Sequence, residues 1–528
     1  MKNLLQDKNK LLSILTYALC VVVVVLAIVS IVLMSVPKKA ITPSGDAPVT
    51  PAPPAPPAAH VHGNLTSSVT LEPNCTDDGV TSYVCDDCHE VVRTETIDPI
   101  GHDYTDAQVT GLCKTCDVKI STLKLTYELS SDGTYYIVSN KNHTLTDPDL
   151  VIPEYYNGKP VKELASDAFV EQKYIVSVSI PSTMEYIGVG AFSTTNIRKL
   201  YFNAANCKDF VGKNWVFYID DSAPSIDVTI GKAVRRVPER LFFPNNSSPD
   251  VLPKIKSITF EEGSHVQSVG DYAFYRARAK ELVLPDTLKS IGEHAFDGAA
   301  IENVSFGTGL ASIGAHAFDY CDKLNSVDLS MTALDGIAQN AFKNCAAITQ
   351  VKLPTSAKKI GTKAFFGCTS LETLILDGGE EICDDAFNGC TALKSVTLPK
   401  TLKTLGLRVF EGCTGLEEIV FNAIDMNDLV SGNRVFYGAG DSDGVTVVIA
   451  DGVKRVPSRL FYSTADASNN LHIKKITMSS TVTDIGDYAF RGTVVDYFGY
   501  TGTAADYDLV TIGAGNTELG TPTYEGEA

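Results

Sequence analysis

The sequence predicts a mainly β solenoid with little α/β character, an array of about 14 units in which one short motif keeps returning. A phenylalanine closes each unit, at spacings of 22 to 32 residues and about 23 on average. Each unit also contains a short alternating run that ends at proline, as in Leu393–Pro399. A chain of 528 residues is too long for one ordinary core, whereas stacked units extend a core indefinitely. The closing residues are Phe169, Phe192, Phe217, Phe242, Phe274, Phe296, Phe318, Phe342, Phe365, Phe387, Phe410, Phe436, Phe461 and Phe490.

Net charge excludes one class of partner. The chain carries a formal charge of −19 and has an isoelectric point near 4.9. Nucleic acid and anionic lipid surfaces would repel such a protein, because phosphate contacts need basic side chains. We therefore expect no nucleic-acid partner.

The N-terminal segment predicts a membrane anchor. Residues 11–36 carry no formal charge and are flanked by lysines on both sides, which is long enough to span a bilayer. We expect an uncleaved single-pass helix in the cell membrane, with residues 1–10 cytoplasmic and the repeats extracellular; a cleaved signal peptide is the alternative. The proline-rich residues 37–59 predict an extended spacer.

Residues 60–118 form a small unit rich in cysteine and histidine. Two Cys-x-x-Cys pairs suit one tetrahedral structural zinc, because each pair presents two thiolates from one turn. Disulfides among the same cysteines are the alternative, since an extracellular setting permits them. No cofactor is otherwise required, and no open catalytic zinc is implied. The predicted ligands are Cys85, Cys88, Cys113 and Cys116, with His102 as a substitute.

This small unit also resembles a known type of module. The stretch from Glu72 to Gly79 and the later Pro99–His102 are similar to a small cysteine–histidine module of large bacterial surface proteins. The resemblance covers about 45 residues of this sequence and leaves the metal undecided.

Caps and repeats follow. Asp-Gly and Asn-Gly pairs between apolar runs predict hairpins in residues 123–160, which would cover the first unit. Units fill 161–493, and 494–528 form a C-terminal cap and tail. Within a unit, Leu393, Val396 and Leu398 should face inward, with Ser395 and Thr397 outward. A ladder of buried, unreactive thiols is expected at Cys321, Cys345, Cys368, Cys390 and Cys413.

The repeat resembles the BspA-type leucine-rich repeat. The units have the form Leu-x-x-Val-x-Leu-Pro-x-x-Leu-x-x-Ile-Gly-x-x-Ala-Phe-x-Gly-Cys, and the resemblance covers residues 123–528. Its ending, Asp496–Thr503, is similar to the terminal cap of that family. The resemblance implies a cell-surface protein that adheres to host or microbial macromolecules, so that an extracellular protein or glycan would be the partner.

A longer duplication underlies the repeats. Two irregular modules, each followed by a polar insertion, match at an offset of 219 residues. They combine aromatic side chains with basic clusters in an acidic chain, a composition that often anchors interfaces. The alternative is that the rings fill the core and the arginines pair with nearby acids. The candidate binding residues are Trp215, Tyr218, Arg235, Arg236, Arg240, Tyr437, Lys454, Arg455 and Arg459.

No reaction centre is visible in the sequence. Outward strand positions are mostly small and polar, and no set of acids, His, Cys or Ser converges as catalysis requires. His294 and His316 occupy equivalent positions in adjacent units, and we expect solvated loop residues rather than a metal pair. The chain is therefore predicted not to be an enzyme. A membrane-tethered adhesin and a structural envelope spacer remain as the two function classes.

Overall fold

The computed structural model describes residues 64–72, 79–97, 125–140, 145, 148–211, 214–217, 224–243, 254–463 and 469–525. The predicted anchor at 11–36, the spacer at 37–59, and His102, Cys113, Cys116 and Tyr218 lie outside these ranges. No helix within the described ranges is both long and apolar enough to cross a membrane.

A small antiparallel sheet precedes the repeats. It consists of β1 (Leu65–Leu71), β2 (Gly79–Cys85) and β3 (Val91–Ile97), in that order. The turn from β2 to β3 carries Cys88, and His89 closes it with a positive φ of 60°.

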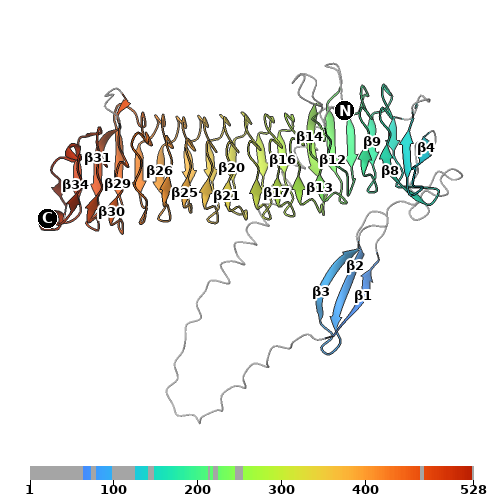
Figure 1. The fold of residues 1–528 in the computed structure, drawn as a ribbon, viewed down its shortest axis with the longest axis horizontal. Helices are drawn as coiled ribbons and strands as arrows, with labels where there is room; N and C mark the ends of the chain where they lie inside the picture. Colours follow the sequence, from blue (N-terminus) through green and yellow to red (C-terminus); the bar gives the residue numbers. More distant parts are fainter. Residues whose placement is uncertain are drawn as a thin grey trace, which may run out of the picture. The chain divides into compact units, whose positions relative to one another are not determined.

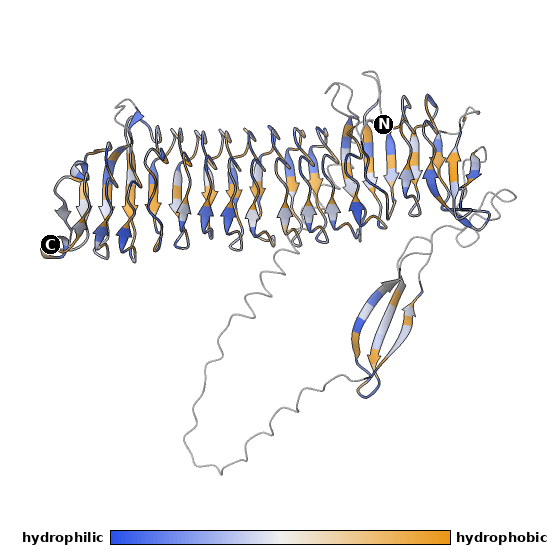
Figure 2. Ribbon diagram, viewed as in Figure 1, coloured by the Kyte–Doolittle hydropathy of each residue, from blue (hydrophilic) through white to orange (hydrophobic). Residues whose placement is uncertain are grey.

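The repeats form a two-sided solenoid of short parallel strands (Figure 1). The first strand of each unit belongs to what we call the front face, where inward apolar residues alternate with outward polar ones (Figure 2). The front strands are β6 (Asp149–Val151), β9 (Ser177–Ile180), β11 (Lys199–Phe202), β12 (Ile226–Ile230), β14 (Ile255–Phe260), β16 (Glu281–Val283), β18 (Asn303–Ser305), β20 (Ser326–Asp328), β22 (Gln350–Lys352), β24 (Thr373–Ile375), β26 (Ser395–Leu398), β28 (Glu418–Phe421), β29 (Val445–Ile449), β31 (His472–Met478), β34 (Phe498–Tyr500) and β36 (Thr523–Tyr524).

Two-residue strands make the back face. A proline or polar turn ends most front strands, and the chain returns through an Ile-Gly type step in which the isoleucine is buried. The back strands are β10 (Tyr186–Ile187), β13 (Arg236–Val237), β15 (Ser268–Val269), β17 (Ser290–Ile291), β19 (Ser312–Ile313), β21 (Gly336–Ile337), β23 (Lys359–Ile360), β25 (Glu381–Ile382), β27 (Thr404–Leu405), β30 (Arg455–Val456), β32 (Asp484–Ile485) and β35 (Thr511–Ile512).

The closing phenylalanines form one continuous stack through the core. All 14 are buried, and each ring centroid lies 5.2–5.8 Å from the next. Backbone bonds tie neighbouring units at the same level; for example, Phe365 N–H donates to the Ala386 carbonyl, 2.8 Å away. The predicted repeat frame is thereby confirmed.

Inward and outward positions also agree with the prediction. Leu393, Val396 and Leu398 are buried, while Ser395 and Thr397 are exposed. The five ladder cysteines are buried and free, and each thiol donates to the carbonyl of the phenylalanine in the preceding unit at 3.0–3.4 Å. Burial raises the pKa of Cys368 and of Cys413 to about 12, so these thiols stay protonated.

The two ends extend the array. The hairpin expected around Asp132-Gly133 is present as β4 (Thr126–Leu129) and β5 (Tyr136–Ser139), and β7 (Tyr155–Tyr156) turns back on β8 (Lys159–Leu164). Solenoid pairing continues beyond residue 493: β33 (Val494–Val495) and β34 pair with β31, and β36 pairs with β34. Two short helices lie between these strands, α3 (Ala504–Tyr507), which a Thr503 and Asp506 capping box begins, and η3 (Thr517–Leu519).

Candidate functional site

One edge of the array carries an unusual column of side chains. The residue two positions before each closing phenylalanine has a positive φ in all 14 units, 49–68°. We call these positions the αL column. Glycine is the residue that suits this backbone best, yet only Gly190 is glycine. The others are Asp167, Trp215, Arg240, Tyr272, His294, His316, Asn340, Lys363, Asp385, Arg408, Arg434, Arg459 and Tyr488.

A neighbouring column shows that glycine is available to this fold. The residue two positions after the closing phenylalanine also has a positive φ in 11 described units. Six of these residues are glycine, among them Gly367, Gly389 and Gly412. Large side chains therefore persist in the αL column at a strain of roughly 1 kcal/mol each, which indicates that their contacts have a role.

Aromatic and basic side chains stack along the N-terminal half of the αL column. The Arg240 guanidinium lies 5.4 Å from the Tyr272 ring centroid. Tyr272 stacks on His294 at 4.7 Å, and His294 stacks on His316 at 4.5 Å. The units repeat at strand spacing, so flat groups at equivalent positions meet face to face.

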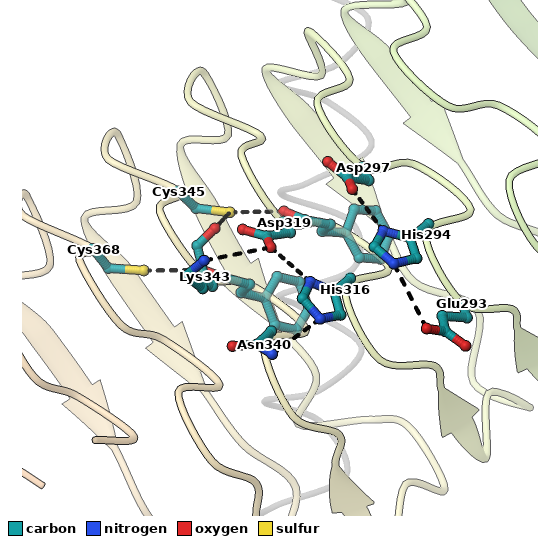
Figure 3. A network of polar contacts seen from close by, with 11 residues as sticks. Glu293, His294, Asp297, His316, Asp319, Asn340, Lys343, Cys345 and Cys368 are labelled. Atoms are coloured by element: carbon teal, nitrogen blue, oxygen red, sulfur yellow. Dashed lines mark hydrogen bonds and ion pairs between the residues drawn. The ribbon is translucent and has the colours of Figure 1, made fainter. Parts of the chain in front are cut away.

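The two histidines join a polar network (Figure 3). His294 Nδ1 is 2.6 Å from Asp297 Oδ2, and His316 Nδ1 is 2.7 Å from Asp319 Oδ2. The Asn340 amide donates to His316 Nε2 at 3.0 Å, which makes Nε2 the acceptor and leaves the proton on Nδ1. The histidine side chains are 19% and 24% exposed, so they are loop residues as predicted but hydrogen-bonded rather than solvated.

The chemistry of this network is limited. Burial raises the pKa of Asp297, although the hydrogen bond from His294 opposes the shift. The nearby Cys345 thiol donates to the Phe318 carbonyl and is buried, so it does not act as a nucleophile. Within the described ranges, no group of three or more His, Cys, Asp or Glu side chains is arranged to hold a metal ion.

The matched modules repeat the same contacts. Arg236 pairs with Asp209, and Arg455 pairs with Asp428 at 2.6 Å, both partners 219 residues apart. Asp209 Oδ1 accepts from the Glu239 N–H, and Asp428 Oδ1 accepts from the Ser458 N–H, each at 2.8 Å. Both modules carry a strand bulge, after residue 226 and after residue 445. In both modules the first arginine thus holds the turn and is already paired.

The other predicted binding residues are spread over this edge. Trp215 is half-buried in the αL column, whereas Arg235 and Lys454 are exposed. Tyr437 lies 4.0 Å below the Arg434 guanidinium, and its hydroxyl accepts from the Asn469 amide at 3.2 Å. Arg240 and Arg459 both lie over a tyrosine of the following unit, Tyr272 and Tyr488.

The repeat itself decides the family. A family model for the BspA type leucine-rich repeat region matches residues 152–247, 251–372, 335–467 and 370–496, in six copies. The chain belongs to the BspA type leucine-rich repeat family. No curated protein matches it.

Three solved structures of leucine-rich repeat and surface proteins share the BspA-type chain's general fold. The leucine-rich repeat protein from Bacteroides ovatus ATCC 8483 is 21% identical, covering 75% of this chain and 92% of its own, with a TM-score of 0.44. The leucine-rich cell surface protein from Faecalibacterium prausnitzii A2-165 is 18% identical, covering 74% and 97%, with a TM-score of 0.28. The pneumococcal vaccine antigen PcpA is 16% identical, covering 78% and 98%, with a TM-score of 0.35.

Sequence reasoning missed half of the aromatic contacts of this BspA-type array. The partner tyrosines Tyr272 and Tyr488 were not singled out, nor were Tyr275 and Arg491 nearby. The available signal was positional, because both partner tyrosines stand two residues before a closing phenylalanine, as Arg240 and Arg459 do.

The turn with Cys85 and Cys88 lies outside the BspA-type array. Both cysteines are free, Cys85 is buried and Cys88 is exposed. The two thiols lie within hydrogen-bonding reach of each other, as two ligands of one zinc ion would. The other predicted ligands are outside the described ranges, so zinc remains a proposal.

Proposed function

We propose that this BspA-type chain is a cell-surface adhesion protein whose array binds an extracellular protein or glycan, with residues 11–36 as its membrane anchor. The observation that carries the proposal is the αL column. It keeps large aromatic and charged side chains at positions where glycine would avoid backbone strain. Tyrosine and arginine are also the residues that most often dominate binding energy at protein interfaces. The proposed role is binding without catalysis.

A spacer role is the second candidate, and the front face favours it. Outward front positions such as Ser326, Ser395 and Thr397 are small and polar, with little area for a partner. A structural envelope protein would need only length and solubility, both of which the array supplies.

Saturable binding separates the two. The purified full-length protein is titrated against immobilised extracellular-matrix proteins, glycan arrays and intact bacterial cells. Adhesion predicts saturable binding to one class of surface and competition by unlabelled protein. Uniformly linear, non-competed signals on all surfaces would favour the spacer instead. Membrane fractionation of cells that express the full chain or a variant without residues 11–36 tests the anchor, which predicts release of the shortened form.

A further inference from the structure

Two matched clusters of arginine and aromatic side chains lie on the αL edge. The N-terminal cluster comprises Arg240, Phe243, Tyr272, Tyr275 and Arg276. The C-terminal cluster comprises Arg459, Tyr462, Tyr488 and Arg491. Arg240 and Phe243 correspond to Arg459 and Tyr462 at the same offset of 219 residues. Their backbones match as well, because the Phe243 N–H donates to the Arg240 carbonyl and the Tyr462 N–H to the Arg459 carbonyl.

Every arginine of the two clusters is stacked rather than ion-paired. The guanidinium carbons of Arg240, Arg276, Arg459 and Arg491 lie 5.2–5.4 Å from a tyrosine ring centroid. None of the four has a carboxylate within ion-pair distance among the residues that the structure describes. Other arginines of the same edge differ, since Arg408 pairs with Asp385 and Arg434 with Glu411 at 2.8 Å.

Stacking leaves the guanidinium ready for a carboxylate. A guanidinium over a ring keeps its in-plane N–H groups free, and these form a fork that matches two carboxylate oxygens. Arg276 and Arg491 are exposed, and Arg240 and Arg459 are half-buried, so a ligand can reach all four. We infer that the two clusters bind carboxylate side chains of an acidic polypeptide, one segment at each cluster. This inference rests on the proposed adhesive function.

The ring faces argue against a sugar ligand. Sugars stack on an open aromatic face, but Tyr272 has Arg240 near one side and a stacked His294 at 4.7 Å. Tyr488 has two arginines near it, and a Cβ on Gly515 would lie 2.3 Å from its ring. What remains accessible is guanidinium edges and partly exposed tyrosines, the composition of protein interfaces. Charge complementarity therefore selects an acidic protein segment.

The spacing of the clusters allows two contacts at once. Phe242 and Phe461, which adjoin the clusters, are nine steps apart in the phenylalanine stack. At the ~4.8 Å spacing of neighbouring strands the clusters lie roughly 43 Å apart along the array. A repetitive acidic ligand that spans this distance would gain affinity from double attachment, by about 100-fold or more when linker and span match.

The test uses immobilised poly-L-glutamate as the probe and the full-length protein as analyte, by biolayer interferometry at physiological salt. Three variants are compared with the parent: Arg240→Gln/Arg276→Gln, Arg459→Gln/Arg491→Gln, and all four together. The matched control is Arg198→Gln/Arg278→Gln, which removes two exposed arginines next to the front strands with the same change of charge. Circular dichroism melts confirm that each variant is folded.

The expected result is saturable binding by the parent that weakens as salt rises. Either double variant should lose affinity by about tenfold or more, the quadruple variant should lose saturable binding, and the control should match the parent. A quadruple Arg→Lys variant keeps the charges but not the fork, and it should also lose most of the binding.

Three outcomes would overturn the inference. These are equal losses in the control and cluster variants, full affinity in the Arg→Lys variant, and saturable binding of the parent to immobilised hyaluronan but not to polyglutamate. Its failure differs from failure of adhesion itself. If the quadruple variant still binds cells or matrix proteins as the parent does, adhesion holds and these clusters are not its site.

Discussion

The Cys345 thiol donates a hydrogen bond to the Phe318 carbonyl oxygen, 3.0 Å away in the preceding unit. The same contact recurs at each of the five ladder cysteines, so every thiol ties one unit to the one before it. Cysteine is small enough to fill the space beside the phenylalanine stack and still offers a weak donor.

These thiols predict a loss of stability in alkali. Cys368 and Cys413 have folded-state pKa values of about 12 against 9.0 when unperturbed, because both are buried. The unfolded chain therefore ionises first as pH rises. Stability is intact below pH 9 and falls as pH rises toward 12. We expect urea melts from pH 8.5 to 10.5 to show this fall, and a smaller one in Cys368→Ala/Cys413→Ala. An identical slope in the double variant would contradict the assignment.

The phenylalanine stack predicts a large cost for truncation. Phe342→Ala or Phe365→Ala should destabilise the protein by about 3–5 kcal/mol, because stacked units cannot collapse into the gap. The exposed front positions give the comparison, and Ser395→Ala or Thr397→Ala should cost under about 0.5 kcal/mol. Denaturant unfolding measures both. The opposite ranking would mean that the inward and outward positions are exchanged.

The αL column predicts an unusual order of tolerance at an exposed turn. Lys363 has a φ of 56° and is half-buried. Asparagine tolerates this backbone, whereas a β-branched residue does not. We expect Lys363→Val to be less stable than Lys363→Asn by about 1–2 kcal/mol in thermal unfolding. Equal melting temperatures would show that the backbone at this turn relaxes at no cost.

The cysteine turn predicts zinc. Full-length protein purified under reducing conditions should contain about one zinc per chain, and a content under ~0.2 would count against the site. Cys85→Ser/Cys88→Ser should lose the metal, because it removes two of the four predicted ligands. Cys383→Ser is the matched control, since Cys383 is a half-buried free thiol of the array. Equal loss in that control would assign the metal to the array.

Most of the fold could be read from the sequence, because each unit states its own period. The closing phenylalanines, the alternation of Leu393–Leu398 and the cysteine ladder all depend on local spacing, which a single sequence displays. The αL backbone could not be read in this way. Trp215, Lys363 and Arg408 are residue types that avoid positive φ, so propensity predicts a different turn there.

The candidate site was only half visible for a related reason. The basic runs around Arg236 and Arg455 stand out in an acidic chain, but both arginines are paired with aspartates about 27 residues earlier. Stacked pairs such as Arg240 with Tyr272 join residues 32 positions apart, across an insertion of irregular length. Only the stacking of units brings such partners together.

The hydrogen bonds between units also set how the array responds to force. Contacts such as Phe365 N–H to the Ala386 carbonyl point along the array, so tension between its two ends loads one junction at a time. The terminal unit would peel away first, and each detached unit would release about 23 residues of chain. Stretching would thus be stepwise and would dissipate work at every step. A tether of this kind yields gradually under flow instead of breaking at once.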